Sequence, residues 1–154
     1  MASTSTNKQP LLIDHVFNYV SNLDLSTNEG INVSGANTAQ LILDATTTDG
    51  ATIEDLYLIS RGTSEYKVNI FLSTANDYLR PNQGYYIGSA STGVAVGNVT
   101  SFILPRTLAP VPQVGSEAFN RALYVGRGYA LWAARQSLTT ISDGPNIALQ
   151  GGWY

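Results

Sequence analysis

The sequence predicts an all-β protein: an antiparallel β-sandwich or jelly roll of about eight short strands, preceded by an extended N-terminal arm. The polar residues are mainly Asn, Thr, Ser, Gly and Tyr, which favour strands and turns over helices. Apolar stretches are short, and turn-forming residues separate them at the spacing of a sandwich. A chain of 154 residues has the length of one domain, and no internal repeat divides it.

Residues 1–39 are predicted to form an N-terminal arm and loop that precede a single sandwich domain of residues 40–154. Residues 1–10 are small and polar without periodicity, as in a mobile arm. Residues 11–20 fit either one face of a helix or an alternating strand. Their aromatic and β-branched side chains favour an extended arm or an edge strand.

The domain itself shows a clear strand pattern. Strands are predicted over residues 40–46, 53–60, 66–74, 84–89, 99–104 and 146–154. In the third of these, Val68 and Ile70 face one way while Asn69 and Phe71 face the other, which predicts a half-buried antiparallel strand. Prolines between residues 105 and 112 mark a long connection, since proline is excluded from central strands.

Two glycine-containing turns are predicted to close hairpins. Asp49-Gly50 is a strong hairpin signal between the first two strands. Gly126-Arg127-Gly128 precedes residues 129–136, and glycine supplies the positive φ that a hairpin tip requires. The same glycines complete neither a phosphate-binding loop nor a dinucleotide fingerprint. For residues 129–136 a helix is the alternative, because Ala, Leu and Arg favour helices, but the surrounding β pattern favours a strand.

Residues that could catalyse a reaction or bind a metal are sparse. The chain has no cysteine, and His15 is its only histidine. The sequence has no Gly-x-Ser-x-Gly nucleophile motif, so no Ser-His-Asp site is expected. A histidine-based metal centre is not expected either, because one histidine has no companion ligands. The densest acidic group lacks calcium-loop spacing and is better explained by turn and surface positions. It consists of Asp44, Asp49, Glu54 and Asp55. We expect no enzymatic activity, no cofactor and no metal.

Charged residues make up 12% of the chain, about half the usual share. Because the cores of interfaces are depleted in charge, this composition indicates a surface that partners cover in part. The net charge is -3 and the eight basic residues are scattered, so no nucleic-acid partner is expected. No segment has the length of a membrane span or the pattern of a secretion signal, so no membrane partner is expected either.

Three segments resemble small β-sandwich virion proteins of tailed bacteriophages. They are residues 66–75 (YKVNIFLSTA), 101–106 (SFILPR) and 121–132 (RALYVGRGYALW). The resemblance extends over residues 40–136. It rests on the general pattern of strands and turns and not on a diagnostic motif, so it transfers no catalytic residue. It implies a non-enzymatic structural protein of the virion, placed on the capsid surface as a decoration or cement protein that binds the capsid lattice.

The resemblance also implies partners: the major capsid protein or other virion proteins, and further copies of the chain, with a trimer favoured. The candidate contact residues lie in the arm and at the second glycine turn. They are Ile13, Phe17, Tyr19, Tyr124, Arg127 and Tyr129. The alternatives are a tail or baseplate component, and a sandwich whose aromatic residues bind a carbohydrate or a receptor. Those aromatic residues are Tyr85, Tyr86, Tyr124, Tyr129, Trp132, Trp153 and Tyr154.

Overall fold

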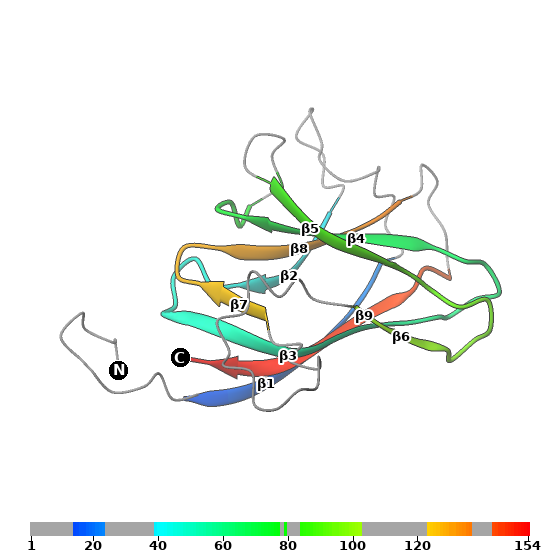
Figure 1. The fold of residues 1–154 in the computed structure, drawn as a ribbon, viewed down its shortest axis with the longest axis horizontal. Helices are drawn as coiled ribbons and strands as arrows, with labels where there is room; N and C mark the ends of the chain where they lie inside the picture. The colour runs from blue at the N-terminus through cyan, green and yellow to red at the C-terminus, as the bar shows by residue number, and fades with distance from the viewer. Residues whose placement is uncertain (1–13, 24–38, 78, 80–83, 103–122, 137–142) are drawn as a thin grey trace, which may run out of the picture.

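The computed structural model describes residues 14–23, 39–77, 79, 84–102, 123–136 and 143–154. These residues form nine strands in two antiparallel sheets, so the predicted all-β class is confirmed. The strands are β1 (His15–Asn22), β2 (Gln40–Asp44), β3 (Gly50–Ile59), β4 (Lys67–Ser73), β5 (Gly84–Ser91), β6 (Val99–Ser101), β7 (Leu123–Gly126), β8 (Ala130–Arg135) and β9 (Asn146–Trp153). Figure 1 shows the sheets as two layers, with β5, β4, β8 and β2 above β3, β9 and β1.

The strands pair in a nested order, which is the topology of a jelly roll. Sheet A has the order β1-β9-β3-β6, with β7 also paired to β3, and sheet B has the order β2-β8-β4-β5. Thus β1 pairs with β9, β2 with β8, β3 with β6 and β7, and β4 with β5. The chain crosses between the sheets at every connection except β4 to β5 and β6 to β7.

The strands β6 and β7 lie end to end on one edge of β3. Along its other edge β3 pairs with β9 from Ala51 to Ile59. Residues Gly50–Ile53 pair with β7, and residues Tyr57–Ile59 pair with β6. Because a strand has only two edges, β6 and β7 together take the place of one jelly-roll strand. The predicted proline-rich connection between them lies outside the described residues.

The main core fills the space between the sheets. Alternate residues of each strand point inward, as the pleat of a strand requires. Ile53 and Leu58 of β3 face Ile70 of β4 and Leu131 of β8 in this core, and all four are buried. Burying an aliphatic side chain of this size stabilises the fold by about 1.5–3 kcal/mol.

A second hydrophobic cluster covers the outer face of sheet B. It joins Phe71, Trp132, Ala134, Leu79 and Ala39 among others. The predicted orientation of Phe71, opposite to Val68 and Ile70, is therefore confirmed, but the prediction of a half-buried strand is wrong. Alternation along β4 does turn this side chain away from the main core, but the second cluster buries it on that side. Sheet B is thus apolar on both faces.

Both predicted hairpins are wrong in the same way. The strands on either side of Asp49-Gly50 are β2 and β3, and those on either side of Gly126-Arg127-Gly128 are β7 and β8. In each case one strand belongs to sheet A and the other to sheet B, so the turn connects the sheets. The two connections lie side by side, since the Ala45 amide donates to the Tyr129 carbonyl (2.9 Å) and the Gly128 amide donates to the Ala45 carbonyl (3.0 Å).

Residues 130–135 form a strand, so the strand prediction for this segment is confirmed and the helix alternative is wrong. Within the predicted arm, residues 15–22 form β1 and pair with β9 at the edge of sheet A, which matches the edge-strand alternative. Residues 1–13 and 24–38 lie outside the described residues.

Candidate functional site

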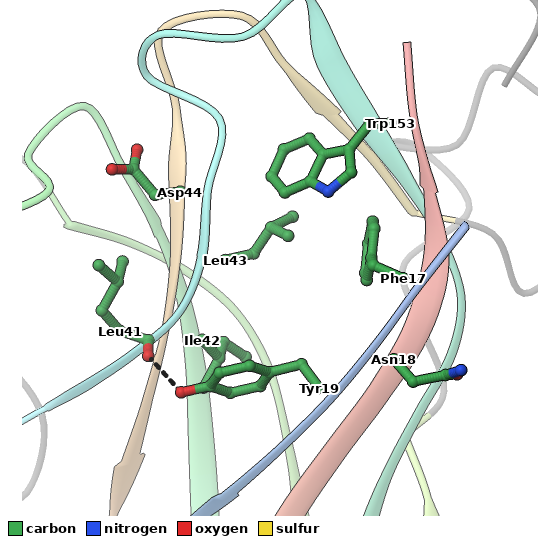
Figure 2. Close-up of a pocket in the computed structure, with 8 residues that line it drawn as sticks. All are labelled: Phe17, Asn18, Tyr19, Leu41, Ile42, Leu43, Asp44 and Trp153. Carbon is green, nitrogen blue, oxygen red and sulfur yellow. Dashed lines mark hydrogen bonds between the residues drawn. The ribbon is translucent and has the colours of Figure 1, made fainter. Parts of the chain in front are cut away.

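A pocket of about 360 Å³ opens between the facing edge strands β1 and β2. It is lined mostly by apolar side chains: Phe17, Asn18, Tyr19, Leu41, Ile42, Leu43, Asp44 and Trp153. Figure 2 shows Phe17, Leu43 and Trp153 pointing toward one another, with Asn18 pointing away from them. The pocket lies where the edges of the two sheets face each other.

Local structure explains why this edge is apolar. The Phe17 and Trp153 rings lie 5.1 Å apart in a tilted arrangement. The Tyr19 hydroxyl donates to the Leu41 carbonyl across the pocket (3.2 Å, Figure 2), which ties the two sheets together at this point. A bulge at Ile42 breaks the alternation of β2, so Ile42 and the adjacent Leu43 both join the main core.

Asp44 is the one acid that lines the pocket, and its carboxylate is held by neighbours. One oxygen accepts a hydrogen bond from the Thr46 amide (2.9 Å) and another from the Thr46 hydroxyl (2.5 Å). The other oxygen accepts a hydrogen bond from the Asn76 side chain (3.0 Å). Burial raises the pKa of Asp44, but these hydrogen bonds favour the charged form more strongly and hold the pKa below its ordinary value.

The lowered pKa predicts a pH-dependent contribution of Asp44 to stability. Because the folded-state pKa lies below the unfolded one, this contribution is complete above about pH 4 and is lost as the pH falls through the folded-state pKa. Asp44→Asn should therefore lose less stability than the unchanged protein between neutral pH and pH 3, in urea unfolding at both. The exposed Asp14→Asn is the matched control. Equal losses for Asp44→Asn and the unchanged protein would contradict the role given to Asp44.

The predicted contact residues form two groups, and the first lies in the arm. Phe17 and Tyr19 point into the sandwich and are half-buried, so both already have partners within the chain. The apolar side chains that β1 exposes are instead Val16 (73% exposed) and Val20 (60%). Their signal in the sequence is the alternation with Phe17 and Tyr19, which assigns them to the opposite face. Ile13 lies outside the described residues.

The second group of predicted contact residues lies at the connection from β7 to β8. The Arg127 side chain is exposed, and its guanidinium lies 3.7 Å from the Asp49 carboxylate on the neighbouring connection from β2 to β3. The Tyr124 ring lies 5.7 Å from the ring of Tyr154. Tyr129 packs against the main core. The sequence gives no sign that Asp49 is the partner of Arg127, because the pair joins two turns that are far apart in the chain.

Other exposed apolar and aromatic side chains lie at the opposite end of the sandwich and on sheet B. Tyr85 and Tyr86 of β5 are about equally exposed, at 60% and 58%. The Tyr86 ring contacts Phe71 edge-on, with 5.8 Å between the ring centres. Val94, Val96 and Val99 are exposed around the start of β6. Trp132, in contrast, is buried and therefore does not contribute to any surface.

Within the described ranges, no three His, Cys, Asp or Glu side chains gather closely enough to hold a metal ion. His15 is exposed, with its imidazole 3.6 Å from the Asp14 carboxylate. No helix in the described part of the chain is long and apolar enough to cross a membrane. No protein-family model, curated protein or solved structure matches this chain.

Proposed function

We propose that this protein is a non-enzymatic structural component of a bacteriophage virion, and that it decorates the capsid by binding the capsid lattice. The observation that carries the proposal is the combination of a jelly-roll sandwich with exposed aliphatic and aromatic side chains in a chain with 12% charged residues. Jelly rolls are used by capsid and lectin domains, and surfaces poor in charge favour association over free solution.

The exposed side chains support binding to a protein surface. Three valines that lie close together in the sequence, Val94, Val96 and Val99, are each more than half exposed. Where exposed apolar side chains form a contiguous patch, they mark a contact site for partners. A decoration protein binds a repeated lattice, so many moderate contacts of this kind suffice without any single strong one.

The test is co-sedimentation of the purified chain with capsids assembled from the major capsid protein of the same virion. We expect saturable binding with a fixed number of copies per lattice position. A chain that stays in the supernatant at saturating capsid concentration would contradict the proposal. Binding to purified tails and not to capsids would place the protein in the tail or baseplate.

Arg127→Ala tests whether the turn between β7 and β8 contacts the capsid. The ion pair with Asp49 is largely exposed, so its loss should change the free energy of unfolding by less than about 1 kcal/mol. Capsid binding should weaken while the urea midpoint stays unchanged. Thr63→Ala, at another exposed turn, is the control. If Arg127→Ala binds capsids as tightly as the unchanged chain, this turn is not part of the contact.

A carbohydrate-binding role is the second candidate, and Tyr85 and Tyr86 favour it. Tyrosines exposed on an edge strand can stack on a sugar ring while their hydroxyls bond to water or ligand. A glycan array probed with the chain and with Tyr85→Ala tests this role. Signal lost in the variant would support it, and an array without signal would reject it.

A further inference from the structure

The free edge of β1 differs from the other free strand edges in the described part of the chain. β1 has eight residues and pairs with β9 in an unbroken register from His15 to Asn22. The edge strand β2 is shorter and is bulged at Ile42. The edge strand β5 is bulged at Ile87, and β6 and β7 have three and four residues. β1 is therefore the longest regular edge.

Soluble proteins usually protect such an edge from pairing with another strand, through lysine, proline, a bulge or short length. The sequence of β1, HVFNYVSN, contains no proline and no Asp, Glu, Lys or Arg. Its exposed face carries Val16, Asn18 and Val20. None of the usual protective features is present in β1, although the other edges have them.

The backbone groups that face this edge follow from the pairing with β9. Residues opposite each other in an antiparallel pair alternate between bonding to each other and pointing their backbone groups outward. The Leu23 amide donates to the Pro145 carbonyl (2.9 Å), and Leu23 continues the register of β1. Because this alternation repeats every two residues, the odd-numbered residues of β1 point their backbone N–H and C=O groups toward β9, as Leu23 does. Val16, Asn18 and Val20 therefore present theirs to the free edge.

We propose that β1 pairs with β1 of a second copy of this chain, antiparallel and about a twofold axis through Asn18. In this register Asn18 lies opposite the partner's Asn18, and Val16 lies opposite the partner's Val20. Each of these pairs has its backbone groups on the free edge, so each exchanges two hydrogen bonds. Sheet A then continues from one copy into the other, and the interface is the same patch on both copies.

Side chains select this register over its neighbours. On the outer face it pairs valine with valine and asparagine with asparagine. On the inner face it places Phe17 opposite the partner's Tyr19, an aromatic pair beside the pocket. Sliding the strands by two residues in either direction places Val20 or Val16 opposite the partner's Asn18. A slip by one residue places backbone groups that face β9 against groups that face the edge.

Charge complementation tests the pairing. Asn18→Lys and Asn18→Asp each place two like charges opposite each other across the axis, and the exposed side chain leaves the fold unchanged. We expect each variant to raise the dimer dissociation constant by about tenfold or more in sedimentation equilibrium. An equimolar mixture pairs the lysine of one variant with the aspartate of the other, so dimers should return. Ser101→Lys, on the opposite edge of sheet A, is the control and should dimerise as the unchanged chain does.

The unchanged chain must itself form a dimer, with Val16, Asn18 and Val20 amides that exchange with solvent more slowly as its concentration rises. A monomer at every concentration, a trimer, or a dimer that neither Asn18 variant weakens would overturn the proposal. Variants that stay monomeric after mixing would overturn it as well. The experiment uses the isolated chain, so its outcome is independent of whether the chain binds capsids.

Discussion

Gly151→Ala is expected to destabilise the protein by about 3 kcal/mol, at the upper end of the range for overpacking a core. Gly151 lies in β9 between Phe17 of β1 and Ile53 of β3. A Cβ at this position would overlap the Thr52 carbonyl oxygen and lie 3.0 Å from the Ile53 Cα. Both atoms belong to the backbone of a central strand, so no side-chain rotation relieves the overlap. Urea unfolding followed by circular dichroism measures the loss.

Gly88→Ala is the matched control for this effect. Gly88 also lies in a strand, and neither glycine has a positive φ. A Cβ at Gly88 would meet no atom within 4 Å. Alanine there should leave stability unchanged or raise it by up to about 1 kcal/mol, because it restricts the unfolded chain. If Gly151→Ala unfolds at the same urea concentration as Gly88→Ala, the close approach of β9 and β3 is not what requires glycine.

The reason for this close approach lies in β3. Its register with β9 shifts between Ile53 and Asp55, so Glu54 is an extra residue in the ladder. A bulge bends its strand, and glycine opposite the bent segment lets the two backbones come together. Neither the bulge nor its partner could be read from the sequence, because they lie about a hundred residues apart along the chain.

The strands themselves were predictable because each depends on short-range alternation. The segments predicted near residues 40–46, 53–60, 66–74 and 84–89 all contain strands. Besides the segment of β1, β8 was ambiguous between helix and strand, and the burial of β8 explains why. All six of its residues are buried, so it lacks the polar positions that distinguish a strand facing water from a helix.

The turns show where local reasoning stops. Gly50 and Gly128 have φ of +120° and +86°, as expected for glycine at tight turns. The turn chemistry was therefore recognised, but the partner of the following strand was not. Whether a chain returns beside the preceding strand or crosses to the other sheet depends on which strands complete each sheet. In a jelly roll the partners are nested, so most of them are distant in sequence.

The predicted contact residues show the same difference between what local sequence determines and what distant strand pairing determines. Arg127, predicted as a contact residue at the second glycine turn, has an exposed side chain there. Phe17 and Tyr19 are predicted contacts because they are large apolar residues of the arm, yet strand alternation turns them into the sandwich and exposes Val16 and Val20. The register of pairing decides which face of a strand is exposed. For β1 this register is set by β9, at the other end of the chain, so it could not be read from the local sequence.

Trp132→Ala is expected to cost about 3–5 kcal/mol of unfolding free energy, as for other large-to-small core substitutions. Trp132 is 3% exposed and packs with Phe71 and Leu79 in the second cluster. Its indole N–H donates to the Ala75 carbonyl (2.9 Å), which ties the segment after β4 to sheet B. Urea unfolding can be followed by the fluorescence of Trp153, the remaining tryptophan.

Trp132→Phe separates packing from the hydrogen bond. Phenylalanine keeps most of the apolar contact but leaves the buried Ala75 carbonyl without its donor, at a cost of about 1–3 kcal/mol. Tyr85→Ala removes an exposed aromatic ring from the same sheet and should cost less than about 1 kcal/mol. If Trp132→Ala were as mild as Tyr85→Ala, the second cluster would not be a core, and Trp132 would again be a candidate for ligand contact. The expected order places Trp132 in the structural role and leaves Tyr85 and Tyr86 as the aromatic residues on sheet B that a sugar could reach.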